Sequence, residues 1–187
     1  MPLPMETDRL ILRQFDLRDV PAFAAYRSDP EVARFQGWDA PFGDEQAAAF
    51  VRSMRRVKPG TPGKWLQLAL QVKATGELAG DCAFRVDSGD PRQAAIGLTL
   101  ARAFQGRGYG HEAMTRLLDY LFFELKLHRV HADCDELNEP AYRSLEKLGL
   151  RREAHFVENL WFKGGWASEY WYAILEREWA ERRKLSS

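Results

Sequence analysis

Three glycines spaced two residues apart form the segment of this sequence whose composition points most directly to chemistry. They lie in Phe104-Gln105-Gly106-Arg107-Gly108-Tyr109-Gly110, between an apolar run at Ala95–Leu100 and a stretch of helical periodicity at Ala113–Leu125. A strand, a glycine turn and a helix in this order let the backbone approach a ligand closely and direct the unpaired amides of the first helical turn at it. The segment therefore predicts a site for an anion such as phosphate.

The spacing of the glycines excludes two other phosphate-binding loops. No Lys-Ser or Lys-Thr pair follows them, and Gly106-x-Gly108-x-Gly110 differs from the G-x-G-x-x-G of dinucleotide folds. Kinase-like and dehydrogenase-like chemistry are therefore not indicated. A glycine-rich turn without a ligand is the alternative that the segment alone leaves open.

The same segment resembles motif A of the GCN5-related N-acetyltransferases (GNAT), Q/R-x-x-G-x-G/A, with Gln105, Gly108 and Gly110 at the matching positions. Pieces from about Glu6 to Trp179 resemble the RimJ/RimL-like branch of that family. They are Thr7-Asp8-Arg9-Leu10-Ile11-Leu12-Arg13, Glu146–Leu150, Arg152-Glu153-Ala154, and a closing strand made of Tyr172–Leu175 with Glu178-Trp179. The resemblance implies an enzyme that moves an acetyl group from acetyl-CoA to a primary amine, with a homodimer as its assembly.

The resemblance also implies which residues hold acetyl-CoA. In the family, the main chain of the strand before the glycines pairs with the pantetheine arm, and the loop amides hold the pyrophosphate. Carried over, these roles fall on Leu98, Thr99, Leu100, Gln105, Gly106, Arg107, Gly108, Tyr109, Gly110 and Asn138. Asn138 equally suits a helix N-cap before Glu139-Pro140, and an exposed loop arginine is the alternative for Arg107.

The acid and the base that the family uses do not stand at their usual positions. Ala141 and Leu145 occupy the places where relatives often carry the residue that protonates the departing thiolate. Tyr142 shares a helical face with Asn138 and is the candidate for that acid, with simple packing on the sheet as the alternative. Ala95 replaces a glutamate that often acts as the base.

Three other residues are candidates for the base, namely Glu158, Asp133 and His131, and none of them stands out. A lysine amine costs about 4–5 kcal/mol to deprotonate at pH 7, against about 1–1.5 kcal/mol for an α-amine. A site without a strong base therefore favours a peptide or protein N-terminus. A small amine such as an aminoglycoside or polyamine is the nearest alternative, and a catalytically weak acyl-CoA-binding module is the alternative from another class.

Aromatic residues gather in two regions that border the acceptor site in relatives. One region holds Trp38 and Phe42, and the other holds Trp161, Phe162, Trp166, Tyr170 and Trp171 around Gly164-Gly165. An apolar acceptor pocket is one interpretation, and cross-strand packing is the other. Glu112, which follows the glycine loop, would compete with a phosphate and is predicted to be structural.

The elements that must position these residues can be predicted from the patterning. Strands are expected at Trp65–Val72, Glu77–Val86, Ala95–Leu100 and Arg129–Cys134 and on both sides of Gly164-Gly165, and a second helix is expected at Asn138–Leu148. The fold class is mixed α/β. The resemblance implies a mostly antiparallel sheet, flanked by helices and splayed between its fourth and fifth strands, with the cofactor in the resulting V.

Composition agrees with one domain over residues 1–187. The chain is 45% hydrophobic, and 27 basic residues balance 27 acidic ones, so no positive field attracts nucleic acid. No segment is predicted to target or span a membrane, and a cytoplasmic location is expected. Cys82 and Cys134 are predicted to be free thiols in strands, and the histidines lack a metal-ligand spacing.

Overall fold

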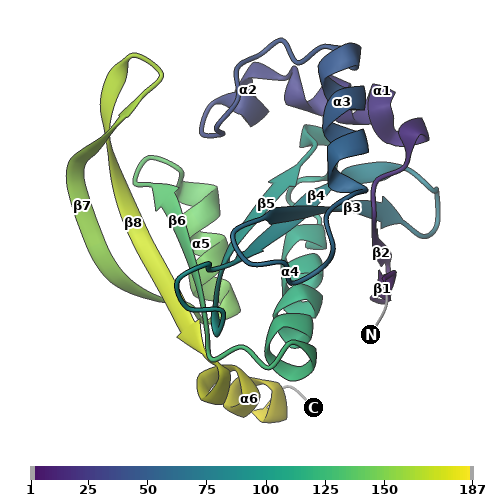
Figure 1. The fold of residues 1–187 in the computed structure, drawn as a ribbon. Helices are drawn as coiled ribbons and strands as arrows, with labels where there is room; N and C mark the ends of the chain where they lie inside the picture. Colours follow the sequence, from purple (N-terminus) through teal and green to yellow (C-terminus); the bar gives the residue numbers. More distant parts are fainter. Residues whose placement is uncertain (1–2, 186–187) are drawn as a thin grey trace.

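A single eight-stranded sheet with the order β1-β2-β3-β4-β5-β6-β8-β7 organises the computed structural model, which describes residues 3–185 (Figure 1). Its strands are β1 (Met5–Glu6), β2 (Leu10–Arg13), β3 (Trp65–Val72), β4 (Leu78–Val86), β5 (Gln93–Leu100), β6 (Arg129–Asp135), β7 (Arg151–Phe162) and β8 (Gly165–Leu175). The predicted meander, β3-β4-β5, is confirmed. The outer ends of the predicted domain, Met1-Pro2 and Ser186-Ser187, lie outside the described residues.

Helices pack on both faces of this sheet. They are η1 (Leu17–Asp19), α1 (Val20–Arg27), α2 (Pro30–Ala33), α3 (Asp44–Met54), η2 (Arg102–Phe104), α4 (Tyr109–Asp119), a π-helical turn η3 (Tyr120–Glu124), α5 (Glu139–Leu148) and α6 (Glu176–Leu185). Alternation along β3 assigns the two faces, because Leu66, Leu68 and Leu70 pack in the core with α4, whereas Ala69 packs in the core with α1 and α3. The mixed α/β class is confirmed.

The sheet splays where the family resemblance implied. β5 and β6 run parallel and pair only from Gln93 to Ala95 and from Arg129 to His131, so the rest of β5 has no strand beside it on that edge. Figure 1 shows β6, β7 and β8 diverging from β5 to form a V. These are the fourth and fifth predicted strands, because the short β1 at Met5–Glu6 was not predicted as a separate strand.

The closing segment was predicted wrongly in one respect. Glu178 and Trp179 lie in α6 rather than in a strand. The Glu178 carboxylate accepts the Leu175 N–H at 2.8 Å, where β8 ends, and the buried Trp179 indole donates to Asp119 at 2.9 Å. These two contacts begin the helix and dock it on the core.

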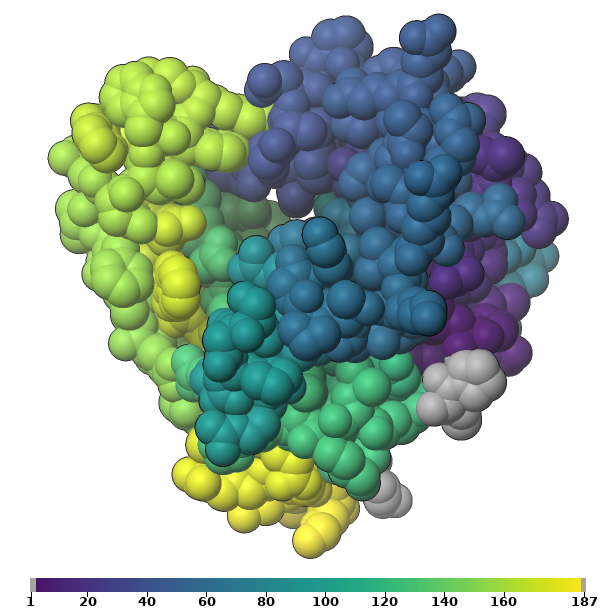
Figure 2. Space-filling view, viewed as in Figure 1, coloured from purple at the N-terminus to yellow at the C-terminus, as the bar shows by residue number. Residues whose placement is uncertain are grey.

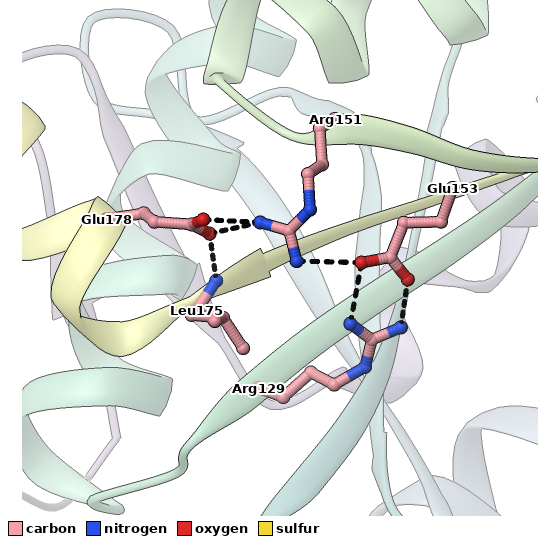
Figure 3. A network of polar contacts seen from close by, with 5 residues as sticks. All are labelled: Arg129, Arg151, Glu153, Leu175 and Glu178. Carbon is pink, nitrogen blue, oxygen red and sulfur yellow. Dashed lines mark hydrogen bonds and ion pairs between the residues drawn. The ribbon is translucent and has the colours of Figure 1, made fainter.

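Ion pairs join the strands at the narrow end of the V (Figure 3). Arg129 of β6 donates to both carboxylate oxygens of Glu153 on β7, at 3.0 and 2.5 Å, and Arg151 bridges Glu153 to Glu178. The Arg129 guanidinium is the main cause that lowers the pKa of Glu153 to about 2. This network fixes the root of the β7–β8 hairpin, which we call the arm.

Replacing Glu153 with Gln should therefore reduce stability in a pH-dependent way. The depressed pKa stabilises the folded state above the ordinary glutamate pKa of 4.5, and this stabilisation is lost as the pH falls toward 2. The shift corresponds to about 3 kcal/mol, which solvent screening reduces to about 1–2 kcal/mol. Urea unfolding should show that the difference between wild type and Glu153→Gln is largest near neutral pH and disappears in acid.

A matched control is Glu45→Gln, because Glu45 is exposed on α3 and forms no ion pair within residues 3–185. A difference for Glu153→Gln that stays constant with pH would contradict the ion-pair explanation.

Three further features bear on the classes of function. Within the described residues, no helix combines the length and the apolar character needed to cross a membrane. Between residues 3 and 185, no three or more His, Cys, Asp or Glu side chains gather closely enough to hold a metal ion. Both cysteines are free, as predicted, and burial raises the pKa of Cys134 to about 12.

Candidate active site

The glycine loop and the first turn of α4 form a set of unpaired donors. Gly106 and Gly108 have φ values of 71° and 82°, and Gly108 is the N-cap of α4. Glu112 donates its N–H to the Gly108 carbonyl at 3.1 Å, and among the described residues no protein acceptor faces the amides from Gly106 to His111. This arrangement fits an anion such as a phosphate group, because the helix N-terminus carries partial positive charge.

Two predicted residues hold this loop against β5. The Gln105 side-chain amide donates to the Leu100 carbonyl at 2.9 Å. Gly110 lies so close to β5 that a Cβ there would be 2.8 Å from Leu98 Cδ2. The loop is therefore docked at the end of β5, beside the open edge of that strand. Arg107 is exposed, with its guanidinium 5.8 Å from the Phe104 ring.

Arg9 is a basic residue of this site that sequence reasoning missed. Its guanidinium donates to Glu112 at 2.6 Å and to the Arg107 carbonyl at 3.0 Å, and a Cβ on Gly108 would lie 3.3 Å from its Nη2. Burial works to raise the pKa of Glu112, but hydrogen bonds from Thr7 and Arg9 outweigh it and lower that pKa. Glu112 is structural, as predicted, and it holds a positive charge at the loop.

The backbone of β5 is available for pairing along the V. Leu98 and Leu100 direct their side chains to the core with α4, whereas Thr99 lies on the opposite face, where it is buried. β4 pairs with only one edge of the strand, so alternate backbone groups beyond Ala95 face the V. A Cβ on Gly97 would meet nothing within 4 Å, so the space above this part of β5 is open.

Asn138 and Tyr142 lie on α5 at the other side of the V. Asn138 is the predicted N-cap, and its side chain accepts the Ala141 N–H at 3.4 Å. The Tyr142 ring packs edge-on against Tyr170 with centroids 5.7 Å apart, and the Arg152 guanidinium lies 5.7 Å from it. Its hydroxyl has no hydrogen-bond partner within residues 3–185. These contacts explain the position of the ring, and its role as an acid stays a prediction.

Two of the candidate bases lie where β5 and β6 diverge. His131 stands in register with Ala95, the position of the missing glutamate, and its ring stacks on Trp171 with centroids 6.0 Å apart. Burial, followed by the Arg129 charge, lowers the pKa of His131, which keeps its imidazole neutral and able to accept a proton. Asp133 lies on the same face and is exposed. Desolvation by neighbouring protein atoms, followed by the Glu169 charge, nevertheless raises the pKa of its carboxyl.

The third candidate base, Glu158, lies farther out on the arm. It has a φ of 48° at an irregularity in β7, where its N–H donates to Ser168 Oγ at 3.0 Å. Together with Asp135, Lys163 and Trp166 it lines a cavity of about 410 Å³ between the arm and the end of β6. The structure thus separates Glu158 from the pair His131 and Asp133.

The two aromatic groups differ in how far their rings are exposed to solvent and thus to an acceptor. Phe42 is buried and packs edge-on against Phe23 in the α1–α3 core, which explains its ring without an acceptor. The indole of Trp38 stacks on the Arg27 guanidinium at 3.8 Å. Trp161 and Trp166 are exposed and pack edge-on as a cross-strand pair, which is the packing alternative for that group.

A buried polar cluster beneath Trp38 carried no signal in the sequence. Arg27 and Asp81 are both almost fully buried, with Arg27 Nη2 3.9 Å from Asp81 Oδ2. The Tyr26 hydroxyl donates to Asp81, and Arg27 also donates to Gln67 at 3.1 Å. Asp81 stands opposite Thr99 in the β4–β5 register, so the cluster lies next to the open part of β5.

A mixed sheet that splays beside a loop of unpaired amides at a helix N-terminus suits a protein with an anionic ligand, and comparisons identify the family. The acetyltransferase (GNAT) domain matches residues 9–151. The uncharacterized N-acetyltransferase YnaD of Bacillus subtilis is 34% identical over 173 residues, covering 92% of this chain and 97% of that protein. A GNAT-family acetyltransferase structure from Bacillus anthracis has a TM-score of 0.83 at 31% identity, over 94% of this chain and 99% of the other.

The chain belongs to the GNAT acetyltransferase family and is an N-acetyltransferase, as the sequence predicted. The RimJ/RimL-like branch is represented among its relatives by the alanine N-acetyltransferase of ribosomal protein uS5 from Escherichia coli. That enzyme is 22% identical over 187 residues, covering 96% of this chain and 94% of the relative.

Proposed function

We propose that this enzyme moves the acetyl group of acetyl-CoA to the α-amine of a peptide or protein N-terminus. The observation that carries the cofactor assignment is the convergence of the unpaired amides at Gly106–His111 with the open edge of β5. The amides and Arg9 would hold the pyrophosphate, and the β5 backbone would pair with the pantetheine arm. RimJ of Mycobacterium smegmatis, which has the same fold with a TM-score of 0.79, was solved with CoA-disulfide.

The chemistry requires a neutral amine to attack the thioester carbonyl, a base for the proton that the amine loses, and an acid for the thiolate. His131 is the residue best placed for the base, because its neutral imidazole lies where β5 and β6 part. Tyr142 is the proposed acid, with its unpaired hydroxyl on α5 next to the V. A single imidazole of lowered pKa suits an α-amine better than a lysine amine, which holds its proton more strongly.

One observation favours a small polyamine as the second candidate acceptor. Asp133, Asp135 and Glu169 lie on one face of neighbouring strands at the V, where they would attract a cationic chain. The spermidine N(1)-acetyltransferase of Vibrio cholerae is 29% identical over 91 residues, or 49% of this chain. One domain over residues 1–187, a homodimer and a cytoplasmic location stay predictions.

Release of coenzyme A from acetyl-CoA, measured with different amines, tests the proposal. The panel contains peptides with a free N-terminus, Nα-blocked lysine peptides, spermidine and an aminoglycoside. We expect kcat/KM near pH 7 to be about 300-fold higher for free N-termini than for blocked lysine peptides, because about that ratio separates their neutral fractions. The ratio should narrow as the pH rises.

Two outcomes would contradict the proposed acceptor or the proposed activity. Turnover dominated by spermidine would make the polyamine the acceptor. A protein that binds acetyl-CoA but releases no coenzyme A with any amine would favour the acyl-CoA-binding module.

A further inference from the structure

The tip of the arm is tied to the other side of the V by one side chain. Lys163 and Gly164, with φ values of 48° and 87°, form the turn between β7 and β8. The Lys163 ammonium donates to the backbone carbonyls of Ala33 and Trp38, each at 2.7 Å, and lies 3.6 Å from Asp39. Figure 2 shows a hollow between the arm and the body of the protein, with the arm meeting the segment after α2 above it.

One of the two acceptors, the Trp38 carbonyl, belongs to a segment that the buried cluster holds in place. The Trp38 indole donates to the Arg27 carbonyl at 3.0 Å and stacks on the Arg27 guanidinium. Arg27 is only 4% exposed, and Asp81 and Gln67 hold it in place. The Trp38 carbonyl is therefore positioned by the buried cluster beside β5, and it presents a fixed acceptor to an ammonium that arrives from the arm.

The outermost part of the arm is weakly anchored, because β8 pairs with β6 only as far as Glu169 and the last contact of β7 in that direction is between His155 and Glu136, at 2.8 Å. From His155 to Trp161 every residue of β7 is exposed, and the ion pairs of Arg129, Arg151 and Glu153 lie at the opposite end of the strand. Hydrogen bonds with a charged donor are about twice as strong as neutral ones, so those of Lys163 contribute a large share of what holds the tip. Loss of the ammonium should release the tip while the root stays in place.

We propose that Lys163 is a latch that closes the acceptor entrance and thereby determines which amines reach the V. The inference rests on the proposed function and places the entry of the acceptor at the hollow between the arm and the Trp38 segment (Figure 2). With the latch closed, an amine at the end of a slender chain, such as a peptide N-terminus, passes beneath the tip. A bulky polycyclic amine enters only when the two carbonyls of Ala33 and Trp38 release the ammonium.

The test compares Lys163→Met with wild type in two measurements. Methionine keeps most of the aliphatic length and removes the donor. Hydrogen–deuterium exchange of the segment 160–168 reports the latch without any substrate, and we expect exchange about tenfold faster in the variant. The second measurement is the ratio of kcat/KM for an aminoglycoside to kcat/KM for an N-terminal peptide, which should rise about tenfold on loss of the same contacts.

Two control variants belong with this test. Lys64→Met removes an exposed lysine whose ammonium has no partner among the described residues, and it should change neither measurement. Asp39→Asn removes the outer ion pair, and because Asp39 is 91% exposed, the latch should persist.

The outcomes separate the latch from the proposed function. Unchanged exchange in Lys163→Met overturns the latch. Faster exchange with an unchanged ratio of kcat/KM values overturns its role in selectivity. Faster exchange in a protein that releases no coenzyme A with any amine leaves the latch standing and overturns the proposed function.

Discussion

Replacing Gly108 with tryptophan should raise the Kd for coenzyme A about 100-fold or more. Gly108 is the N-cap of α4 with a φ of 82°, and a Cβ there points toward the Arg9 guanidinium at 3.3 Å. An indole at this position strains the backbone and fills the space that a phosphate must enter to reach the amides of the loop. A 100-fold change equals about 2.7 kcal/mol, within what several hydrogen bonds to a charged ligand supply.

Isothermal titration of coenzyme A checks this prediction, and Gly43→Trp is its matched control. Gly43 is also a helix N-cap, that of α3, but its φ is −73° and a Cβ there meets nothing within 4 Å. Gly108→Ala separates strain from obstruction, because it keeps the conformational cost and leaves the space for phosphate open. Unchanged affinity in a folded Gly108→Trp protein would contradict the placement of the phosphate site at this loop.

Replacing Asp81 with leucine should lower the free energy of unfolding by about 3–5 kcal/mol, because it leaves a buried cation without its partner. Arg27 is 4% exposed and has the Asp81 carboxylate as its buried counter-charge, and the Tyr26 hydroxyl loses its acceptor in the same change. The Arg27 Nε already lacks a hydrogen-bond partner, so loss of the carboxylate leaves the Gln67 side chain as the hydrogen-bond acceptor of the guanidinium among the described residues.

Urea unfolding measures this loss, and a double variant tests its cause. Arg27→Leu combined with Asp81→Leu removes both charges and should recover part of the stability lost in Asp81→Leu alone. Asp8→Leu, at an exposed aspartate in the turn between β1 and β2, should change stability by less than about 0.5 kcal/mol. Additive losses in the double variant would show that the two charges do not stabilise each other.

The buried cluster also connects stability with the proposed latch. Arg27 supports the Trp38 indole, and the Trp38 carbonyl accepts the hydrogen bond from Lys163. Asp81→Leu should therefore also speed hydrogen–deuterium exchange at the tip of the arm. The Trp38 carbonyl, which accepts the Lys163 hydrogen bond, and the buried cluster of Arg27 and Asp81 beside β5 are thus parts of one packed unit.

The features that the sequence determined by itself are those with a local physical signature. Glycine permits the positive φ values at Gly106 and Gly108, alternation of apolar residues defines β3, and Asn138 before Glu139-Pro140 caps a helix. Each of these signals depends on a few neighbouring residues, so the loop, the strand and the cap could all be predicted.

Tertiary structure alone decided the contacts that join distant residues. Arg9 reaches Glu112 across 103 positions, and Lys163 reaches Trp38 across 125. An arginine or lysine in a turn looks the same in a sequence whether it faces solvent or a carbonyl, because its partner is selected by the packing of the whole sheet and not by its neighbours. For the same reason only the folded chain shows that His131 stands beside Ala95 and that Phe42 turns into the core.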